Sequence, residues 1–214
     1  MGGDAPRWSG LTSRPGRRYK GDLVIQETHI AFIPHKAGPS APGFQCELQQ
    51  VTGAYYYDFT EEHSWLLHLR VKDPIPVGAQ RTHDIQFRLK QANARGQAQS
   101  QQEDFSHFRE QLQLALTSAT EGRVHQIELW EETGLKGSNQ SPLLRSPSTM
   151  ACISELPFRV VRWEEINSVL LQRMTPFGRT CDIAVISQAP STELALSLDG
   201  VDKKQAETFT RWMR

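Results

Sequence analysis

Trp65-Leu-Leu-His-Leu-Arg-Val-Lys72 alternates in character with a period of two: Trp65, Leu67, Leu69 and Val71 fall on one set of alternate positions. Leu66, His68, Arg70 and Lys72 fall on the other set. Successive side chains of a β-strand point to opposite faces, so this period predicts a strand with one buried face. Residues 84–90 repeat the alternation with Ile85, Phe87 and Leu89. The chain is therefore predicted to be mainly β.

Strand-like runs followed by one amphipathic helix occur twice in the 214 residues. The first series is predicted at 21–33, 44–57, 65–72 and 84–90, with a helix over 101–116. The second is predicted at 123–130, 158–171, 181–187 and 193–198, with a helix over 202–213. The order predicts an α+β fold of two mainly antiparallel β units, each closed by its C-terminal helix.

The two predicted helices carry one apolar stripe each. In the first helix the stripe consists of Phe105, Phe108, Leu112, Ala115 and Leu116, which recur at helical spacing. In the second it consists of Ala206, Phe209 and Met213, after a capping signal at Asp202-Lys-Lys-Gln205. Each helix is expected to lie across an open end of its sheet.

Composition places the chain among ordinary globular proteins. It is 38% hydrophobic and 22% charged, with a formal net charge of zero, which does not favour general nucleic-acid binding. No apolar run approaches the roughly twenty residues of a spanning helix, and the N-terminus lacks a signal-peptide pattern. We expect a cytoplasmic protein, either free or peripheral at a membrane. Cys46, Cys152 and Cys181 are far apart and predict free buried thiols.

We predict three segments along the chain. Residues 1–20, rich in Gly, Pro, Arg and Ser, are expected to be a flexible basic N-terminal segment. Residues 21–118 form the first domain and 122–214 the second. Within the second domain, the Gly-, Pro- and Ser-containing stretch 134–149 is predicted to be an exposed loop insertion.

Three stretches carry a resemblance to the pleckstrin-homology (PH) superfold. Tyr19-Lys-Gly-Asp-Leu-Val-Ile-Gln-Glu-Thr-His-Ile-Ala-Phe-Ile33 and Phe44-Gln-Cys-Glu-Leu-Gln-Gln-Val-Thr-Gly53 are similar to the GRAM branch of that superfold. Leu156-Pro-Phe-Arg-Val-Val-Arg-Trp-Glu-Glu-Ile-Asn-Ser-Val169 is similar to the same step in PH-like domains. The resemblance implies tandem PH-like units, each a curled antiparallel β-barrel closed by a C-terminal helix.

The resemblance also implies a lipid site, because PH-like domains that bind phosphoinositides carry cations around the loop between their first strands. The candidate lipid-binding residues here are Arg14, Arg17, Arg18, Lys20 and Lys36. Each cation near an anionic surface contributes about 1 kcal/mol. Four cations together correspond to about millimolar affinity, which does not hold a protein on a membrane alone. The alternative is an ordinary basic tail.

Aromatic residues supply a second candidate surface. Tyr55, Tyr57 and Trp65 are candidates for contact with a partner protein. Alternation sends about half of such rings into the core, so core packing is the alternative role.

No pattern indicates catalysis or a cofactor. The seven histidines are scattered, no pair has the spacing of a metal site on a helix, and no G-x-S-x-G or H-E-x-x-H sequence occurs. We therefore expect no enzymatic activity, no metal and no cofactor.

Three functions remain open at this stage. The first is an adaptor that binds a protein segment through an exposed sheet edge or the groove beside a closing helix. The second is a peripheral membrane module that binds anionic lipid through the basic N-terminal segment. The third is a tandem PH module that binds histones or nucleic acid, which the neutral charge disfavours.

Overall fold

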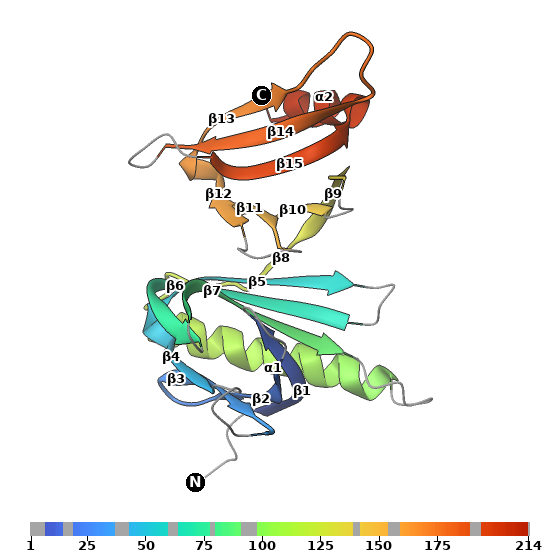
Figure 1. Ribbon diagram of the computed structural model, residues 1–214. Helices are drawn as coiled ribbons and strands as arrows, with labels where there is room; N and C mark the ends of the chain where they lie inside the picture. The colour runs from blue at the N-terminus through green and yellow to red at the C-terminus, as the bar shows by residue number, and fades with distance from the viewer. Residues whose placement is uncertain are drawn as a thin grey trace. The chain divides into compact units, whose positions relative to one another are not determined.

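The computed structural model describes residues 7–14, 19–36, 43–59, 64–77, 80–90, 98–138, 142–153, 159–188 and 194–213. The chain divides into two compact units, unit 1 at Met1–Leu129 and unit 2 at Trp130–Arg214 (Figure 1). Each unit has its own hydrophobic core.

Unit 1 is built on an eight-stranded sheet in the order β4-β3-β2-β1-β7-β6-β5-β8. Its neighbouring strands are antiparallel, except that β8 runs parallel to β5. A short 3-10 helix, Leu48–Gln50, joins β4 to β5. The strands are β1 (Arg7–Arg14), β2 (Tyr19–Ile25), β3 (His29–Pro34), β4 (Phe44–Glu47), β5 (Val51–Phe59), β6 (Ser64–Val77), β7 (Gln80–Lys90) and β8 (Glu128–Leu129).

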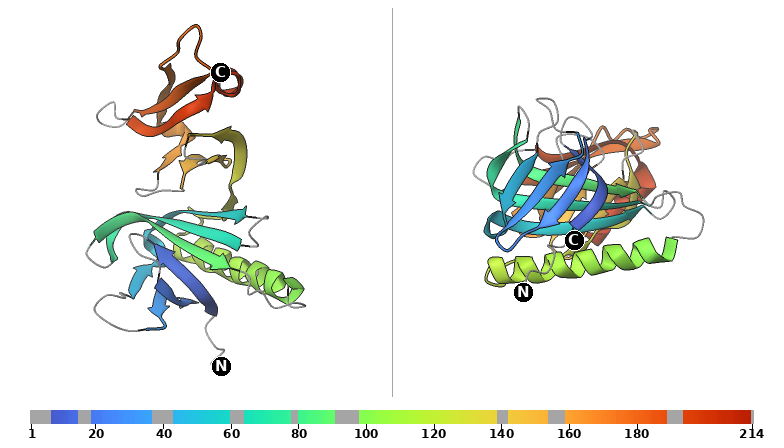
Figure 2. Two further views of the ribbon diagram at one scale, coloured as in Figure 1. Left: turned by 45° about the vertical axis from the view of Figure 1, so that its right-hand side comes forward. Right: turned by 90° about the horizontal axis from the view of Figure 1, so that it is seen from below.

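One helix, α1 (Ala98–Ala119), runs alongside this sheet (Figure 2). Its predicted apolar stripe faces the core: Phe105, Phe108, Leu112 and Leu116 are all buried. Trp65 of β6 stacks on Phe105 with ring centroids 5.0 Å apart. The predicted burial of its apolar stripe is confirmed. The helix begins a few residues earlier than the sequence indicated.

Unit 2 contains two antiparallel sheets and the helix α2 (Lys203–Trp212). The four-stranded sheet has the order β12-β11-β10-β9 and the three-stranded sheet the order β13-β14-β15. A 3-10 turn at Trp163–Glu165 connects the two sheets. The strands are β9 (Glu131–Lys136), β10 (Pro142–Arg145), β11 (Thr149–Cys152), β12 (Arg159–Arg162), β13 (Ile166–Gln172), β14 (Thr180–Ser187) and β15 (Leu194–Asp202).

The helix α2 starts at the predicted cap. The carboxylate of Asp202 accepts hydrogen bonds from the backbone amides of Lys204 and Gln205, which have no partner within the helix. Ala206 and Phe209 are buried in the core of unit 2, and Met213 packs against that core. The core-facing stripe predicted for this helix is confirmed.

Three predictions about segments are wrong. Residues 7–14 of the expected flexible segment form β1, which pairs with both β2 and β7. The expected insertion 134–149 contains the end of β9, all of β10 and the start of β11, and Leu143 and Leu144 are fully buried. Between 123 and 130 only β8 is a strand, and Val124 and Ile127 belong to the core of unit 1.

The sheet orders leave each described sheet with two terminal strands. The mainly β, antiparallel character is therefore confirmed, whereas closure of each unit into a barrel stays a prediction. The domain limits 21–118 and 122–214 also stay a prediction. The helix α1 and residues 120–129, which follow it, belong to the same compact unit.

Candidate functional site

The strand β13 is a terminal strand that carries no charged side chain. Its sequence is Ile-Asn-Ser-Val-Leu-Leu-Gln over Ile166–Gln172, and within its sheet it pairs with β14 alone. Terminal strands expose unpaired backbone amide and carbonyl groups, and proteins commonly protect them with charged residues. The other terminal strands of the described sheets all carry charge: β4 has Glu47, β8 Glu128, β9 Glu131, β12 Arg159 and β15 Asp199.

A groove of about 680 Å³ borders β13. Its walls come from residues 166–171 of β13, from Trp163 in the preceding turn, and from Thr210 and Met213 at the end of α2. All of these lining side chains are uncharged. The groove therefore lies between an edge strand and the helix α2. A groove beside a C-terminal helix is one of the two surfaces predicted to bind a protein segment.

The groove offers both apolar and polar surface, because β13 divides its side chains between two faces. Ile166, Val169 and Leu171 pack partly against the core of unit 2, while Leu170 points outward with 45% of its surface exposed. On the opposite wall, Thr210 donates its hydroxyl hydrogen to the backbone carbonyl of Ala206, one turn earlier, at 3.1 Å. The wall formed by α2 thus presents a satisfied hydroxyl and the thioether of Met213.

An ion pair holds the end of β13 in place. Arg173 directly follows the strand and donates hydrogen bonds from Nε and Nη2 to the carboxylate of Asp182 on β14. The backbone amide of Gly200 donates to the same carboxylate at 2.9 Å. The hydrogen bonds from Arg173 hold the pKa of Asp182 below its usual value, with the Gly200 amide acting in the same direction and desolvation opposing it.

A second groove in unit 2, of about 480 Å³, lies between β9 and α2. It has a buried apolar floor of Leu135 and Phe209 and a charged rim that includes Glu132, Arg145 and Lys204. Rim charges are paired, since Glu132 lies 3.7 Å from Lys136 and Arg145 lies 3.7 Å from Glu131. This groove is less suited to a main-chain partner because β9 has the charged edge that β13 lacks.

Two of the five predicted lipid-binding cations, Lys20 and Lys36, lie at the same end of β2 and β3. The backbone amide of His35 donates to the carbonyl of Lys20 at 2.9 Å, which brings exposed Lys20 and exposed Lys36 to the same end of the sheet. Buried Asp22 lies beside them, with Oδ1 2.7 Å from Nε2 of His35. Arg14 lies at the end of β1, with its side chain outside the described set, and Arg17 and Arg18 lie outside the described residues.

The aromatic candidates are buried. Tyr55, Tyr57 and Trp65 expose 4%, 8% and 7% of their surfaces, and Trp65 belongs to the core of unit 1. The exposed aromatic surface expected from the sequence is therefore wrong, and Trp65 takes the alternative role of core packing. Trp65 lies on the core face of β6, where it stacks on Phe105 of α1.

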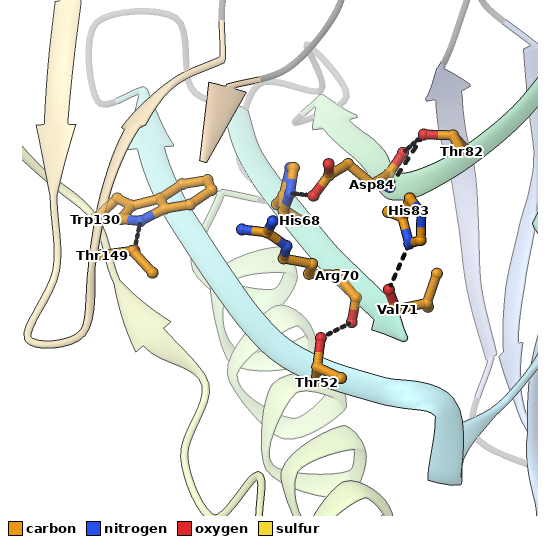
Figure 3. Close-up of polar contacts among 9 residues, drawn as sticks. All are labelled: Thr52, His68, Arg70, Val71, Thr82, His83, Asp84, Trp130 and Thr149. Carbon is orange, nitrogen blue, oxygen red and sulfur yellow. Dashed lines mark hydrogen bonds and ion pairs between the residues drawn. The ribbon is translucent and has the colours of Figure 1, made fainter. Parts of the chain in front are cut away.

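Polar side chains on β5 to β7 serve the sheet itself (Figure 3). Nε2 of buried His68 lies 2.9 Å from Oδ1 of Asp84, and the hydroxyl of Thr82 hydrogen-bonds the backbone of Asp84. In unit 2 the indole of Trp130 donates to the hydroxyl of Thr149 at 2.9 Å. These contacts satisfy polar groups that are wholly or partly buried.

Within the described residues, no group of three or more His, Cys, Asp or Glu side chains is placed to hold a metal ion. The three cysteines are free, and Cys46 and Cys181 are buried. Burial, assisted by Glu47, raises the pKa of Cys46 to about 11, and burial also raises the pKa of Cys181. A protonated buried thiol is a poor nucleophile.

Sequence reasoning located the strand that became β13 but not its position at an edge. The signal was present as a seven-residue run without charge, Ile166–Gln172. What the run did not disclose is which strands pair with it, because pairing depends on residues far away in the chain.

Unit 1 thus combines a mainly antiparallel sheet with a following helix that covers its core. A family model for the PH-like domain of the FACT complex subunit SPT16 matches residues 6–124. This match covers more than half of the chain, and the chain belongs to that family.

Two solved structures are also similar to this chain. That of the Spt16D Pob3N heterodimer shares 12% sequence identity over 90% of this chain and 94% of its own, with a TM-score of 0.41. The Vps36 N-terminal PH domain shares 17% identity over 47% of this chain and 76% of its own, with a TM-score of 0.31. In the part of the chain that the structure describes, no helix is long and apolar enough to cross a membrane.

Proposed function

We propose that this protein is a non-enzymatic adaptor that binds an extended segment of a partner protein in the groove between β13 and α2. The segment adds to the three-stranded sheet as a further strand beside β13. The observation that carries this proposal is that β13 is a terminal strand without charge beside a groove lined with uncharged side chains.

Strand addition suits this geometry for two reasons. The outer backbone groups of β13 can form main-chain hydrogen bonds with any extended segment, which supplies affinity independent of sequence. The half-buried side chains of Val169, Leu171 and Met213 offer apolar surface to alternate side chains of that segment. The bound segment would thus use both walls of the groove.

We also propose that unit 2 is a second PH-like domain, so that the protein is a tandem of such domains. The support is the repeated order: unit 2 consists of antiparallel strands followed by a helix whose apolar face closes the core. The family match ends at residue 124, so the argument for unit 2 is architectural.

The test is a selection of peptides on the immobilised full-length protein from a displayed library of random heptapeptides. Binding of the selected peptides is then measured for two groove variants, Leu170→Lys on β13 and Thr210→Lys on α2. We expect each variant to lower the affinity at least tenfold, because a lysine at the edge blocks strand addition and a lysine on the helix narrows the groove.

The matched control is Phe177→Lys. Phe177 lies in the turn after β13, outside the groove lining, and exposes 97% of its surface. A peptide held by general hydrophobic attraction would lose affinity for this control as well. The proposal is overturned if no peptide is selected, or if the selected peptides bind both groove variants as well as the wild type.

A second function is favoured by the position of Lys20 and Lys36. The structure brings these exposed cations to one end of β2 and β3, where we propose weak binding of anionic lipid with the help of Arg14, Arg17 and Arg18. The test is cosedimentation with phosphatidylcholine vesicles that contain or lack phosphatidylserine. Replacement of all five cations by alanine should abolish any excess binding to the anionic vesicles, and equal sedimentation with both kinds of vesicle would rule out this function.

The remaining expectations stay predictions. They are the GRAM-like character of the first unit, binding of histones or nucleic acid, and a cytoplasmic location. The neutral net charge still disfavours nucleic acid.

A further inference from the structure

We infer that the occupant of the groove between β13 and α2 is a segment that pairs over about five residues and is neutral where its side chains enter the groove, and that a charge on one of those side chains excludes it. This inference rests on the proposed function and names the class of partner segment. It also implies a control mechanism, because phosphorylation of a Ser, Thr or Tyr whose side chain enters the groove would prevent binding.

The length follows from the register of β13. Its pairing with β14 is irregular between Ile166 and Ser168 and regular from Ser168 to Gln172. A bulge disturbs the spacing of main-chain groups, so continuous addition of a strand is limited to the regular part. That part holds about five residues and is about 17 Å long.

The neutrality follows from the walls. The groove lining contains backbone, aliphatic, aromatic, thioether, amide and hydroxyl groups, and no side chain of opposite charge for a Lys, Arg, Asp or Glu of the segment. The nearest arginine along the strand, Arg173, already donates to Asp182. A charged side chain that enters the groove would lose water without gaining an ion pair, which disfavours binding.

The alternation follows from the strand itself. Side chains of an added strand point in turn toward α2 and away from it. Those that point toward α2 meet Val169, Leu171 and Met213, which are already half-buried and gain by further burial. We therefore expect apolar residues at the alternate positions that point toward α2.

A second copy of this chain is the competing occupant, since two uncharged edges could pair with each other. Pairing of two β13 strands would form about as many main-chain hydrogen bonds as pairing of β13 with a partner segment. However, the outward face of each β13 carries only one large apolar side chain, Leu170, for the second copy to bury. Sedimentation of the wild type and of Leu170→Lys distinguishes this case. A wild-type dimer that dissociates in the variant would overturn the inference.

The test uses the peptides recovered from the heptapeptide library that lose affinity for Leu170→Lys. Compared with the unselected library, we expect Lys, Arg, Asp and Glu to be at least tenfold depleted at alternate positions, those that point toward α2, within a core of about five residues. Undiminished charge at these positions would overturn the inference while leaving the proposed function intact. Recovery of no groove-dependent peptide would instead overturn the proposed function, and the inference with it.

The second arm uses one recovered peptide that contains Ser or Thr at a central position depleted of charge, where the side chain points toward α2. Its phosphorylated form should bind at least tenfold more weakly than the unmodified form. The matched control peptide carries its phosphate on a serine added two residues beyond the five-residue core, and it should bind like the unmodified peptide. Equal affinities for the centrally phosphorylated and unmodified peptides would contradict the inference.

Discussion

Arg173 donates two hydrogen bonds to the carboxylate of Asp182 across the base of the hairpin that joins β13 to β14. Arg173 also has a positive φ of 53°, a conformation that side-chain-bearing residues seldom adopt. The ion pair thus accompanies a strained backbone at the point where the candidate groove ends. The ion pair stabilises the hairpin, whereas the left-handed backbone at Arg173 destabilises it. Substitutions at Arg173 can separate these two effects.

Replacement of Arg173 by glycine and by alanine separates them. Both variants lose the ion pair, but only alanine keeps a Cβ in the left-handed region. We expect Arg173→Gly to be more stable than Arg173→Ala by about 1 kcal/mol in urea denaturation. Equal stability of the two variants would show that the backbone at this position relaxes without cost.

The same pair predicts a stability change in acid. The pKa of Asp182 in the folded protein lies below its ordinary value of 3.8, chiefly because Arg173 donates to the carboxylate. Between these two pKa values the unfolded chain binds more protons than the folded chain, so stability rises with pH there. The contribution is therefore complete above the ordinary pKa and is lost as the pH falls through the folded pKa.

The measurement compares urea denaturation of the wild type and of Asp182→Asn between pH 5 and pH 3. The variant lacks the titrating carboxylate, so its stability should fall less steeply over this range. Parallel curves for the two proteins would mean that Asp182 has the same pKa in the folded and unfolded chains.

Phe209 and Phe177 form a matched pair for testing how α2 closes unit 2. Phe209 is 6% exposed in the core, whereas Phe177 is 97% exposed in the turn after β13. We expect Phe209→Ala to lower the free energy of unfolding by about 3–5 kcal/mol and Phe177→Ala to change it by less than about 0.5 kcal/mol. Thermal or urea denaturation measures both, and similar effects of the two substitutions would contradict the closing role of α2.

The sequence was informative wherever a short-range period reports burial. The alternation at residues 65–72 predicted the central part of β6, and the stripe from Phe105 to Leu116 predicted the buried face of α1. Both patterns are local, since each residue's neighbours in the chain determine which way its side chain points. The cap at Asp202 was predictable for the same reason.

The sequence was less informative wherever a partner lies far along the chain. Strand β1 pairs with β7, and Thr12 faces Arg88, so no local pattern marked residues 7–14 as a strand. Residues 134–149 looked like a loop because of their Gly, Pro and Ser content, yet Leu135 and Leu143 are buried in the core of unit 2. The edge position of β13, and with it the candidate site, depended on the same long-range pairing.

Ile127 tests where unit 1 ends. Sequence periodicity assigned this residue to the second domain, but it is buried in the core of unit 1 with 4% exposed surface. Ile127→Ala should cost about 2–5 kcal/mol by leaving a cavity in that core. The expected readout is local: hydrogen exchange, followed by mass spectrometry, should become faster in β5 and β6 and stay unchanged in β14.

The matched control Leu129→Ala alters a residue that is 38% exposed and should leave exchange in both units close to that of the wild type. Faster exchange confined to β14 would instead place Ile127 in the second domain, because only the unit that loses the buried side chain is destabilised by the cavity.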